Sequence, residues 1–317
     1  MKVIVLHDTE RDEVVNEVCA AVRSIGHEAL TVAFGDDVVM IATRLRDEAP
    51  DLVFNLTESF AGKSALDSGI ASLLNLLHLR YTGSSHSGLL LAGDKVLAKR
   101  ILSFHGIRTP EFAVLHRGAL ENAEELRFPV IVKPPQEDAS IGITAASVAH
   151  DVNELLARVG EIQRQHGGPI LVERFIEGRE FYVGVLGNEQ AEALPPAELD
   201  MSAFPDGVPR VATWSAKWEA DDEAASGRTV FPDGLDPGVS DRMREAAVAA
   251  FRALRLRDYA RVDIRLDGGG EPFVLEVNPN CYLARGEVFA EAAERTGLSY
   301  EALIGRILEL AASRYAR

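Results

Sequence analysis

The sequence predicts a mixed fold, with an α/β domain first and α+β structure after it, and three observations lead to this prediction. Strand-like apolar runs alternate with amphipathic helical runs as far as residue 82, an order typical of an open parallel sheet. From about Ala92 the alternation loses the spacing of a parallel sheet, which favours α+β structure. Near the C-terminus, residues 259–280 have the pattern of two strands joined by a glycine-rich turn at 267–270.

The first domain is predicted to span residues 1–91. Its expected elements are strands at 3–6, 29–34, 51–56 and 80–82, and helices at 14–22, 37–48 and 64–77. The glycines at 83 and 88 do not have the spacing of a nucleotide-binding fingerprint, so residues 83–88 are predicted to be a linker.

Two subdomains are predicted to follow, at 92–175 and 176–317. Their expected elements are strands at 111–115, 130–133, 170–173 and 181–186, the hairpin at 259–280, and helices at 93–104, 152–165, 241–254 and 300–315. Residues 194–237 are polar and rich in Pro, Gly, Asp and Ala. We predict that they form a lid or a disordered excursion, because such long loops in compact enzymes commonly do.

Composition limits the function classes. The chain has 317 residues and a formal net charge of −16, which argues against a nucleic-acid-binding surface. Its two cysteines, Cys19 and Cys281, lack the spacing of a zinc site or a disulfide framework. The N-terminal apolar run is too short for a signal peptide, and no segment approaches the roughly 18 apolar residues of a membrane span. We therefore expect a cytoplasmic protein with no nucleic-acid or membrane partner.

The C-terminal hairpin carries the polar residues that say most about function. Side chains alternate along a strand, so Arg261 and Asp263 share one face, and Glu276 and Asn278 share a face on the second strand. The alternate residues of that strand, Leu275 among them, point to the opposite face, where they are expected to pack into the apolar core. Two carboxylates and an amide are hard oxygen ligands that suit Mg²⁺. A purely structural hairpin is the alternative, but it would not need these polar groups.

Two further segments have features of a nucleotide site. Lys133 ends an apolar strand between two prolines, and an ammonium in that place must find a partner. The small-residue loop at 135–142 can fold its N–H groups over phosphates, although a plain turn fits equally well. The strand and connector at 170–180 can bind an adenine edge through backbone groups, with Glu173 accepting from the amine and Glu180 taking the ribose hydroxyls. A solvated interdomain hinge is the alternative for this connector.

Together these elements resemble the ATP-grasp superfamily, and within it the D-alanine–D-alanine ligase-like branch. The resemblance covers nearly the whole chain, from a Rossmann-like domain ending in Tyr81-Thr82-Gly83-Ser84 to Glu276-Val277-Asn278-Pro279-Asn280. It also includes Asp94-Lys95…Lys99, Gly106-Ile107-Arg108-Thr109-Pro110, Pro129 to Gly142, Val172 to Gly187, and Arg261-Val262-Asp263. The combination is specific, although no single piece is.

The resemblance implies ATP and Mg²⁺ (or Mn²⁺) as cofactors, and it implies roles for individual residues. The binding residues are the phosphate-contacting lysines Lys95 and Lys133, the adenine hinge Glu173, Phe175 and Ile176 (the last two through their backbones), the ribose ligand Glu180, and the metal ligands Asp263, Glu276 and Asn278. The catalytic residues are Ser140 of the phosphate-covering loop, the lid lysine Lys217, and Arg261, which stabilises the transferring phosphoryl group and the oxyanion.

The substrate-binding segments depart from the dipeptide-forming enzymes. Residues 279–285 replace Thr-Ser-Pro-Gly-Met-Thr after the metal-binding Asn, and residues 55–62 replace a His-Gly…Gly-Glu-Asp-Gly stretch. Ala139 and Trp218 stand where a serine and a tyrosine are expected. We therefore predict a substrate larger or more acidic than alanine, with Trp218 in its site and Arg285 as its anchor. A solvated residue at a helix start is the alternative for Arg285.

The predicted function is an ATP-dependent carboxylate–amine ligase that acts through an acyl phosphate, on an amino acid or an amino-acid-like metabolite. Its partners are small-molecule carboxylate and amine substrates, and the family resemblance implies a homodimer. One alternative is a D-alanine–D-alanine ligase. Another is a non-catalytic nucleotide-binding protein, whose mark would be loss of a metal ligand or lysine, and none is missing.

Overall fold

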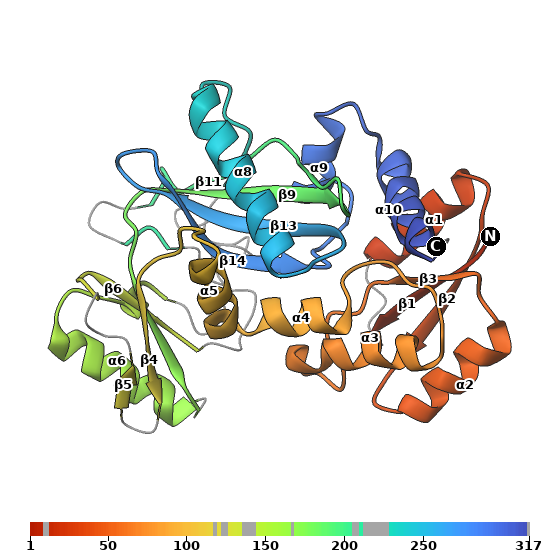
Figure 1. The fold of residues 1–317 in the computed structure, drawn as a ribbon, viewed down its shortest axis with the longest axis horizontal. Coiled ribbons are helices and arrows are strands. Elements are labelled where there is room, and N and C mark those ends of the chain that lie inside the picture. The colour runs from red at the N-terminus through yellow and green to blue at the C-terminus, as the bar shows by residue number, and fades with distance from the viewer. Residues whose placement is uncertain are drawn as a thin grey trace.

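The computed structural model describes residues 1–8, 13–116, 119–121, 126–134, 144–165, 168–204, 209–211 and 228–315. Within these residues the strands form three sheets, one in each part of the chain. In Figure 1 the N-terminal domain lies at the right, the central subdomain at the lower left, and the C-terminal sheet with helix α8 above and between them. The mixture of parallel and antiparallel sheets confirms the predicted fold class.

The N-terminal sheet is parallel, with strand order β2-β1-β3. Its elements are β1 Lys2–Asp8, α1 Glu13–Ser24, β2 Glu28–Phe34, α2 Val38–Glu48, β3 Leu52–Asn55 and α3 Asp67–Leu76, the last preceded by the 3₁₀ turn Ser64–Leu66. The predicted fourth strand at 80–82 is wrong, because only Tyr81 bridges to Val53. Gly83 has a φ of +85° and turns the chain away directly afterwards.

The second half of the segment predicted as a linker, residues 86–88, is helical. Ser85 accepts the N–H of Gly88 and caps α4 His86–Gly93. Asp94 then caps α5 Lys95–Phe104 by accepting the N–H groups of Val96 and Leu97 at 3.0 Å each. The linker prediction considered the spacing of the glycines and not these two capping residues, and for residues 86–88 it is wrong.

The central sheet is antiparallel, with strand order β5-β4-β8-β6-β7. Its strands are β4 Phe112–His116, β5 Ala119–Glu121, β6 Val130–Lys133, β7 Val148–Ala149 and β8 Ile170–Arg174. Helix α6 Val152–Gln165 covers one face, where Val159 and Ile162 pack against the strands.

The C-terminal sheet has the order β12-β11-β9-β13-β14, with β10 paired to β9. Its strands are β9 Arg179–Gly187, β10 Glu192–Ala193, β11 Ala197–Asp200, β12 Arg228–Val230, β13 Asp258–Leu266 and β14 Pro272–Pro279, and α8 Pro237–Ala253 packs on it. The insert at 194–237 is therefore not one loop, because β11 and β12 belong to this sheet. Residues 205–208 and 212–227 of the insert lie outside the described residues, so its order stays a prediction.

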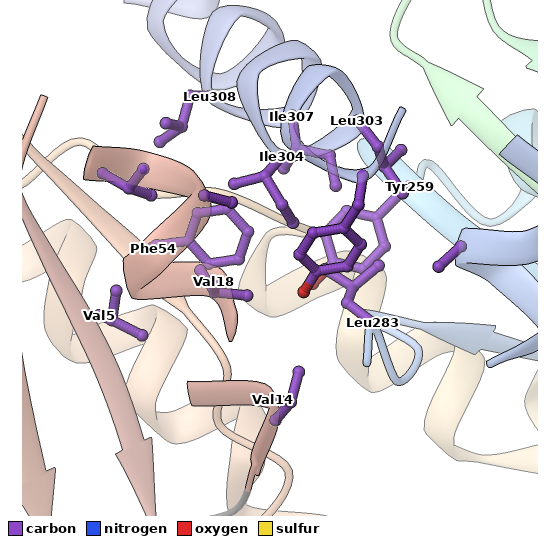
Figure 2. Close-up of a cluster of buried hydrophobic side chains, with 14 of the residues drawn as sticks. Val5, Val14, Val18, Phe54, Tyr259, Leu283, Leu303, Ile304, Ile307 and Leu308 are labelled. Atoms are coloured by element: carbon purple, nitrogen blue, oxygen red, sulfur yellow. The ribbon is translucent and has the colours of Figure 1, made fainter. Parts of the chain in front are cut away.

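Two interfaces join the parts of the chain. Ala98 and Leu102 of α5 belong to the same core as α8 and the C-terminal sheet. Figure 2 shows the other interface, where Val18 and Phe54 of the N-terminal domain meet Ile304 and other residues of the last helix. The elements that complete this second core are α9 Val288–Glu294, which was not predicted, and α10 Tyr300–Arg314. The predicted boundaries at 91 and 175 remain predictions.

A buried carboxylate also ties the end of the N-terminal domain to the C-terminal sheet. Asp258 is fully buried, accepts the N–H of Gly83 at 2.7 Å and pairs with Arg314 of α10. Asn280, directly after β14, accepts the N–H of Ser84 at 2.8 Å. Asp258 has a φ of +63°, a strain that costs on the order of 1–3 kcal/mol in a non-glycine residue. These contacts offset the strain and fix residues 83–84 against the hairpin β13–β14.

Candidate active site

The hairpin β13–β14 brings its polar residues together as the alternation predicts. Asp263 lies directly across from Glu276, and Arg261 lies across from Asn278. One detail differs, because the pairing jumps from Asp263–Glu276 to Ile264–Val274. This bulge leaves an extra residue on β14. Val274 is therefore fully buried, whereas Leu275, which was expected to pack behind, is only half-buried.

Each carboxylate of the hairpin faces a cation. The Arg261 guanidinium binds Asp263 with two hydrogen bonds, Nε to Oδ1 at 2.7 Å and Nη2 to Oδ2 at 3.0 Å. Burial lowers the pKa of Arg261, but the Asp263 carboxylate raises it more, so the guanidinium stays charged. The same guanidinium lies 4.7 Å from the ring centroid of Tyr182 on β9. On the second strand, Lys95 Nζ lies 3.4 Å from Glu276 Oε2.

The donor chemistry of the hairpin fits a hard divalent cation. Two carboxylates and one amide lie on one face of two paired strands. In the described part of the chain, no cluster of three His, Cys, Asp or Glu side chains suits a metal, so this candidate set needs the amide oxygen of Asn278 as its third ligand. Asp263 is only 2% exposed, and both of its carboxylate oxygens accept from Arg261.

A second charged cluster lies where α5 meets the central sheet. The Glu173 carboxylate, 1% exposed, sits between Lys133 Nζ at 3.2 Å and Lys99 Nζ at 3.3 Å. Lys99 is equally buried and also donates to the Thr109 hydroxyl at 2.8 Å. Burial raises the pKa of Glu173, but Lys133 and Lys99 lower it more, so the net shift is downward. Glu173, which was predicted to accept from the adenine amine, thus already holds two ammonium groups, one of them on Lys133, a predicted phosphate contact.

The connector between β8 and β9 is only partly free to hold an adenine. The N–H of Phe175 donates to the Pro129 carbonyl at 2.9 Å, so this predicted hinge donor is already used. Arg265 donates to the Ile176 carbonyl at 3.3 Å and lies 5.0 Å from the Phe175 ring centroid. Glu180, the predicted ribose ligand, is 5% exposed and pairs with Arg265 at 3.3 Å.

A cavity of about 700 Å³ opens beside the hairpin, between the N-terminal domain and the C-terminal sheet. Lys95, Arg261, Glu276 and Asn278 line one part of it. Among its other lining residues are Asp8, Thr57, Glu58, Ser59 and Asp67 of the N-terminal domain, Tyr182 of β9, and Cys281, Tyr282, Glu287 and Val288 of the segment after β14. Carboxylate activation and amine binding can therefore share one cavity.

The structure does not bring Arg285 to this cavity. Its guanidinium pairs with Glu301 and stacks on Tyr300, with the centroid 4.1 Å away, and its side chain is 42% exposed. Its N–H donates to Glu17 at 2.8 Å. The geometry therefore opposes the predicted anchor role, because the positive charge is already neutralised on the outer surface of α10. Three other predicted residues, Ser140, Lys217 and Trp218, lie outside the described residues, and their roles stay predictions.

Sequence reasoning missed several residues of the site. Lys99 could have been found, because it follows Lys95 by four residues and therefore shares its helix face. Tyr182 and Glu287 carried no local signal, since they reach the cavity only through the pairing of β9 with β13 and the turn before α9.

Comparisons with known proteins agree with this geometry. The family model described as the D-ala D-ala ligase C-terminus matches residues 101–309. A D-alanine–D-alanine ligase of Desulforudis audaxviator is 32% identical over 303 residues, which cover 94% of this chain and 92% of that protein. An uncharacterized protein of Sinorhizobium fredii is 36% identical over 309 residues, 95% of this chain and 88% of that protein.

Solved structures share the fold. A D-alanine–D-alanine ligase of Bacillus anthracis complexed with ATP has a TM-score of 0.77 at 22% identity and covers 99% of this chain and 98% of its own. A D-Ala:D-Ser ligase of Enterococcus faecalis has a TM-score of 0.75 at 20% identity, over 98% and 99% of the two chains. The family model and the relatives show that this chain belongs to the D-alanine–D-alanine ligase family of ATP-grasp enzymes, and it is an ATP-dependent carboxylate–amine ligase that forms a C–N bond with release of ADP and phosphate.

Proposed function

We propose that this enzyme uses ATP and Mg²⁺ to join the carboxylate of an amino acid to an amine in the cavity beside β13–β14. The observation that carries the proposal is the cross-strand register, which sets Asp263 against Glu276 and Arg261 against Asn278. Arg261, Glu276 and Asn278 line the cavity. Lys95 reaches the same wall from α5 and pairs with Glu276. Phosphoryl transfer depends mainly on positioning and on neutralising spread negative charge, and this is what such an arrangement supplies.

The residues divide the work between two steps. In the first, a carboxylate oxygen attacks the γ-phosphorus and the bond to the leaving ADP oxygen breaks, while Lys95 and Lys133 hold the phosphates. Asp263, Glu276 and Asn278 would hold Mg²⁺, which neutralises phosphate charge when bound.

In the second step, the amine nitrogen attacks the acyl carbon, the C–O bond to phosphate breaks, and the nitrogen loses a proton. Arg261 stabilises the oxyanion that forms between these events. Cys281 lines the same cavity, but burial raises the pKa of its thiol to about 12, so it stays protonated and is not the nucleophile.

A second candidate is D-alanine–D-alanine ligase activity, because relatives at 30–33% identity are named D-alanine–D-alanine ligases. The part of the substrate prediction that called for an acidic substrate loses its support, since Arg285 lies outside the cavity. We also keep the prediction of a cytoplasmic protein and that of a homodimer, which rests on the family resemblance. The net charge of −16 supports the prediction that it has no nucleic-acid partner. Among the described helices, none is long and apolar enough to span a membrane.

The test is ADP release with D- and L-amino acids as carboxylate donors and hydroxylamine as the trapping amine. Hydroxylamine nitrogen attacks an acyl phosphate at carbon and expels phosphate, which leaves a hydroxamate for mass spectrometry. The proposal expects hydroxamate that depends on ATP, on Mg²⁺ and on Glu276. ADP release without hydroxamate from any amino acid would contradict it.

A further inference from the structure

The charges in the cavity constrain the amine substrate. When two α-amino acids are joined, the first contributes its carboxylate to the reaction and keeps an ammonium group. The second contributes its amine and keeps a carboxylate. A cavity built for that product therefore needs an acid for the first substrate and a spare cation for the second.

The described cavity residues supply acids but no spare cation. Lys95 and Arg261 are the basic residues among them, and both lie at the hairpin, paired with Glu276 and Asp263. The acidic residues of the lining are more numerous, namely Asp8, Glu58, Asp67, Glu276 and Glu287. A first substrate with a free ammonium suits this surface, and so does a second substrate that carries a positive charge.

Glu287 is the acid best placed to meet the second substrate. It precedes α9 and ends the segment that runs from Asn278, so it lines the cavity on the side of the hairpin's open end. Its side chain is exposed, and so is that of Glu58 in the N-terminal domain, which lines the same cavity. Partial burial raises the pKa of Glu287, and the Arg261 guanidinium, which lines the same cavity, opposes that rise.

We propose that Glu287 selects an amine substrate that lacks a free carboxylate and carries a second ammonium group, as a short diamine does. One ammonium loses its proton to water, its nitrogen forms a bond to the acyl carbon, the C–O bond to phosphate breaks and phosphate leaves, while the other ammonium pairs with Glu287. This inference rests on the proposed function, because an acyl phosphate must form before an amine can be selected.

The first arm of the experiment isolates that dependence. Wild-type enzyme is assayed for hydroxamate with each amino acid, and the amino acid with the highest yield becomes the carboxylate donor. If none yields hydroxamate, the proposed function fails and this inference falls with it. If hydroxamate forms, every later outcome concerns Glu287 alone.

The second arm compares 1,4-diaminobutane, D-alaninamide and D-alanine as amines, using the ratio of their kcat/KM values within one enzyme. Wild type should prefer the diamine over D-alanine by at least about tenfold, with the neutral amide between them, since tenfold corresponds to about one good charge contact. Glu287→Gln should lower this ratio about tenfold, and Glu287→Arg should favour D-alanine. A ratio within one enzyme is unaffected by a uniform loss of activity.

The matched control is Glu294→Gln, which removes the same charge from the exposed face of α9. It should leave the ratio at the wild-type value. A wild-type preference for D-alanine, or a ratio that Glu287→Gln and Glu294→Gln change equally, would overturn the proposal.

Discussion

The charged groups of this site fall into two regions that differ in burial. On the nucleotide side, Lys99 and Lys133 both pair with Glu173, and the side chains of Lys99 and Glu173 are 1% exposed. On the acceptor side, Glu58 and Glu287 are exposed to the cavity. A buried charge that loses its partner destabilises the fold, whereas an exposed one costs little. The difference teaches that the nucleotide side serves stability as well as binding, while the acceptor side is free to vary with the substrate.

The largest effect is expected where the two regions meet, at Glu276. Glu276→Gln should lower kcat for ADP release about 10³-fold, because it removes a metal ligand and a charged contact made in the transition state. Its side chain is 26% exposed, so the fold should survive. Glu192→Gln, on the exposed edge strand β10 of the same sheet, is the control. Activity within a few-fold of wild type would remove Glu276 from the metal site.

Asp263→Ala tests the same site less cleanly. Its loss leaves the Arg261 guanidinium without its bidentate partner in a buried position, so it should cost stability as well as turnover.

On the nucleotide side, Glu173→Gln should destabilise the protein by about 3–5 kcal/mol, because it leaves the buried Lys99 ammonium without its carboxylate partner. Urea unfolding measures this change. The comparison between the two regions predicts that Glu287→Gln, measured the same way, changes the free energy of unfolding by less than about 0.5 kcal/mol. Equal losses in the two variants would break the comparison.

The pH profile sharpens the same prediction. The folded-state pKa of Glu173 lies below its usual 4.5, so its contribution to stability is complete above that pH. The contribution is lost as pH falls through the lowered folded-state pKa. Wild type should therefore lose stability in acid faster than Glu173→Gln. Parallel profiles would show that the lysines do not hold this carboxylate.

A smaller effect is expected at the joint between the domains. Gly83→Ala places a Cβ 2.3 Å from Asn280 Oδ1 at a φ of +85°, so it combines backbone strain with a displaced Asn280. We expect a loss of about 2–3 kcal/mol together with reduced turnover. Gly106→Ala is the matched control, because its φ is +70° but nothing lies within 4 Å of the added Cβ. If both variants lose the same stability, the contact with Asn280 does not matter.

The smallest effect concerns Cys281. Although it lines the cavity, it is 8% exposed and burial raises the pKa of its thiol to about 12. Iodoacetamide at mildly alkaline pH should therefore modify it much more slowly than a free cysteine, because the thiolate is the nucleophile. Mass spectrometry of the labelled peptide measures the rate. Rapid labelling would show that this wall of the cavity opens.

The sequence predicted those parts of the fold that depend on local patterns. Alternation along residues 259–280 placed Asp263 and Glu276 on facing strands, and the register confirms it. It could not predict the bulge at Leu275, because a bulge depends on which residue of the partner strand is opposite. It also missed the capping role of Ser85, since serine suits a loop as well as a helix start.

The candidate site was harder to predict because its walls come from distant segments. The expected role of Arg285 depended on where α10 packs, and Glu301 on that helix is what occupies its guanidinium. Similarly, nothing near Glu173 in the sequence indicates that Lys99 on α5 is its partner. Such contacts are set by tertiary packing, on which local patterns carry no information.

The core in Figure 2 has a consequence for how the chain is made. Val18 of α1 and Phe54 of β3 pack against Leu303, Ile304 and Ile307, so the apolar face of the first domain is covered by a helix about 250 residues further on. At ribosomal rates of about 5–20 residues per second, that face waits roughly 10–50 s for its partner. During this interval the nascent first domain exposes this apolar surface to solvent, and chaperone binding or aggregation competes with the packing of α10.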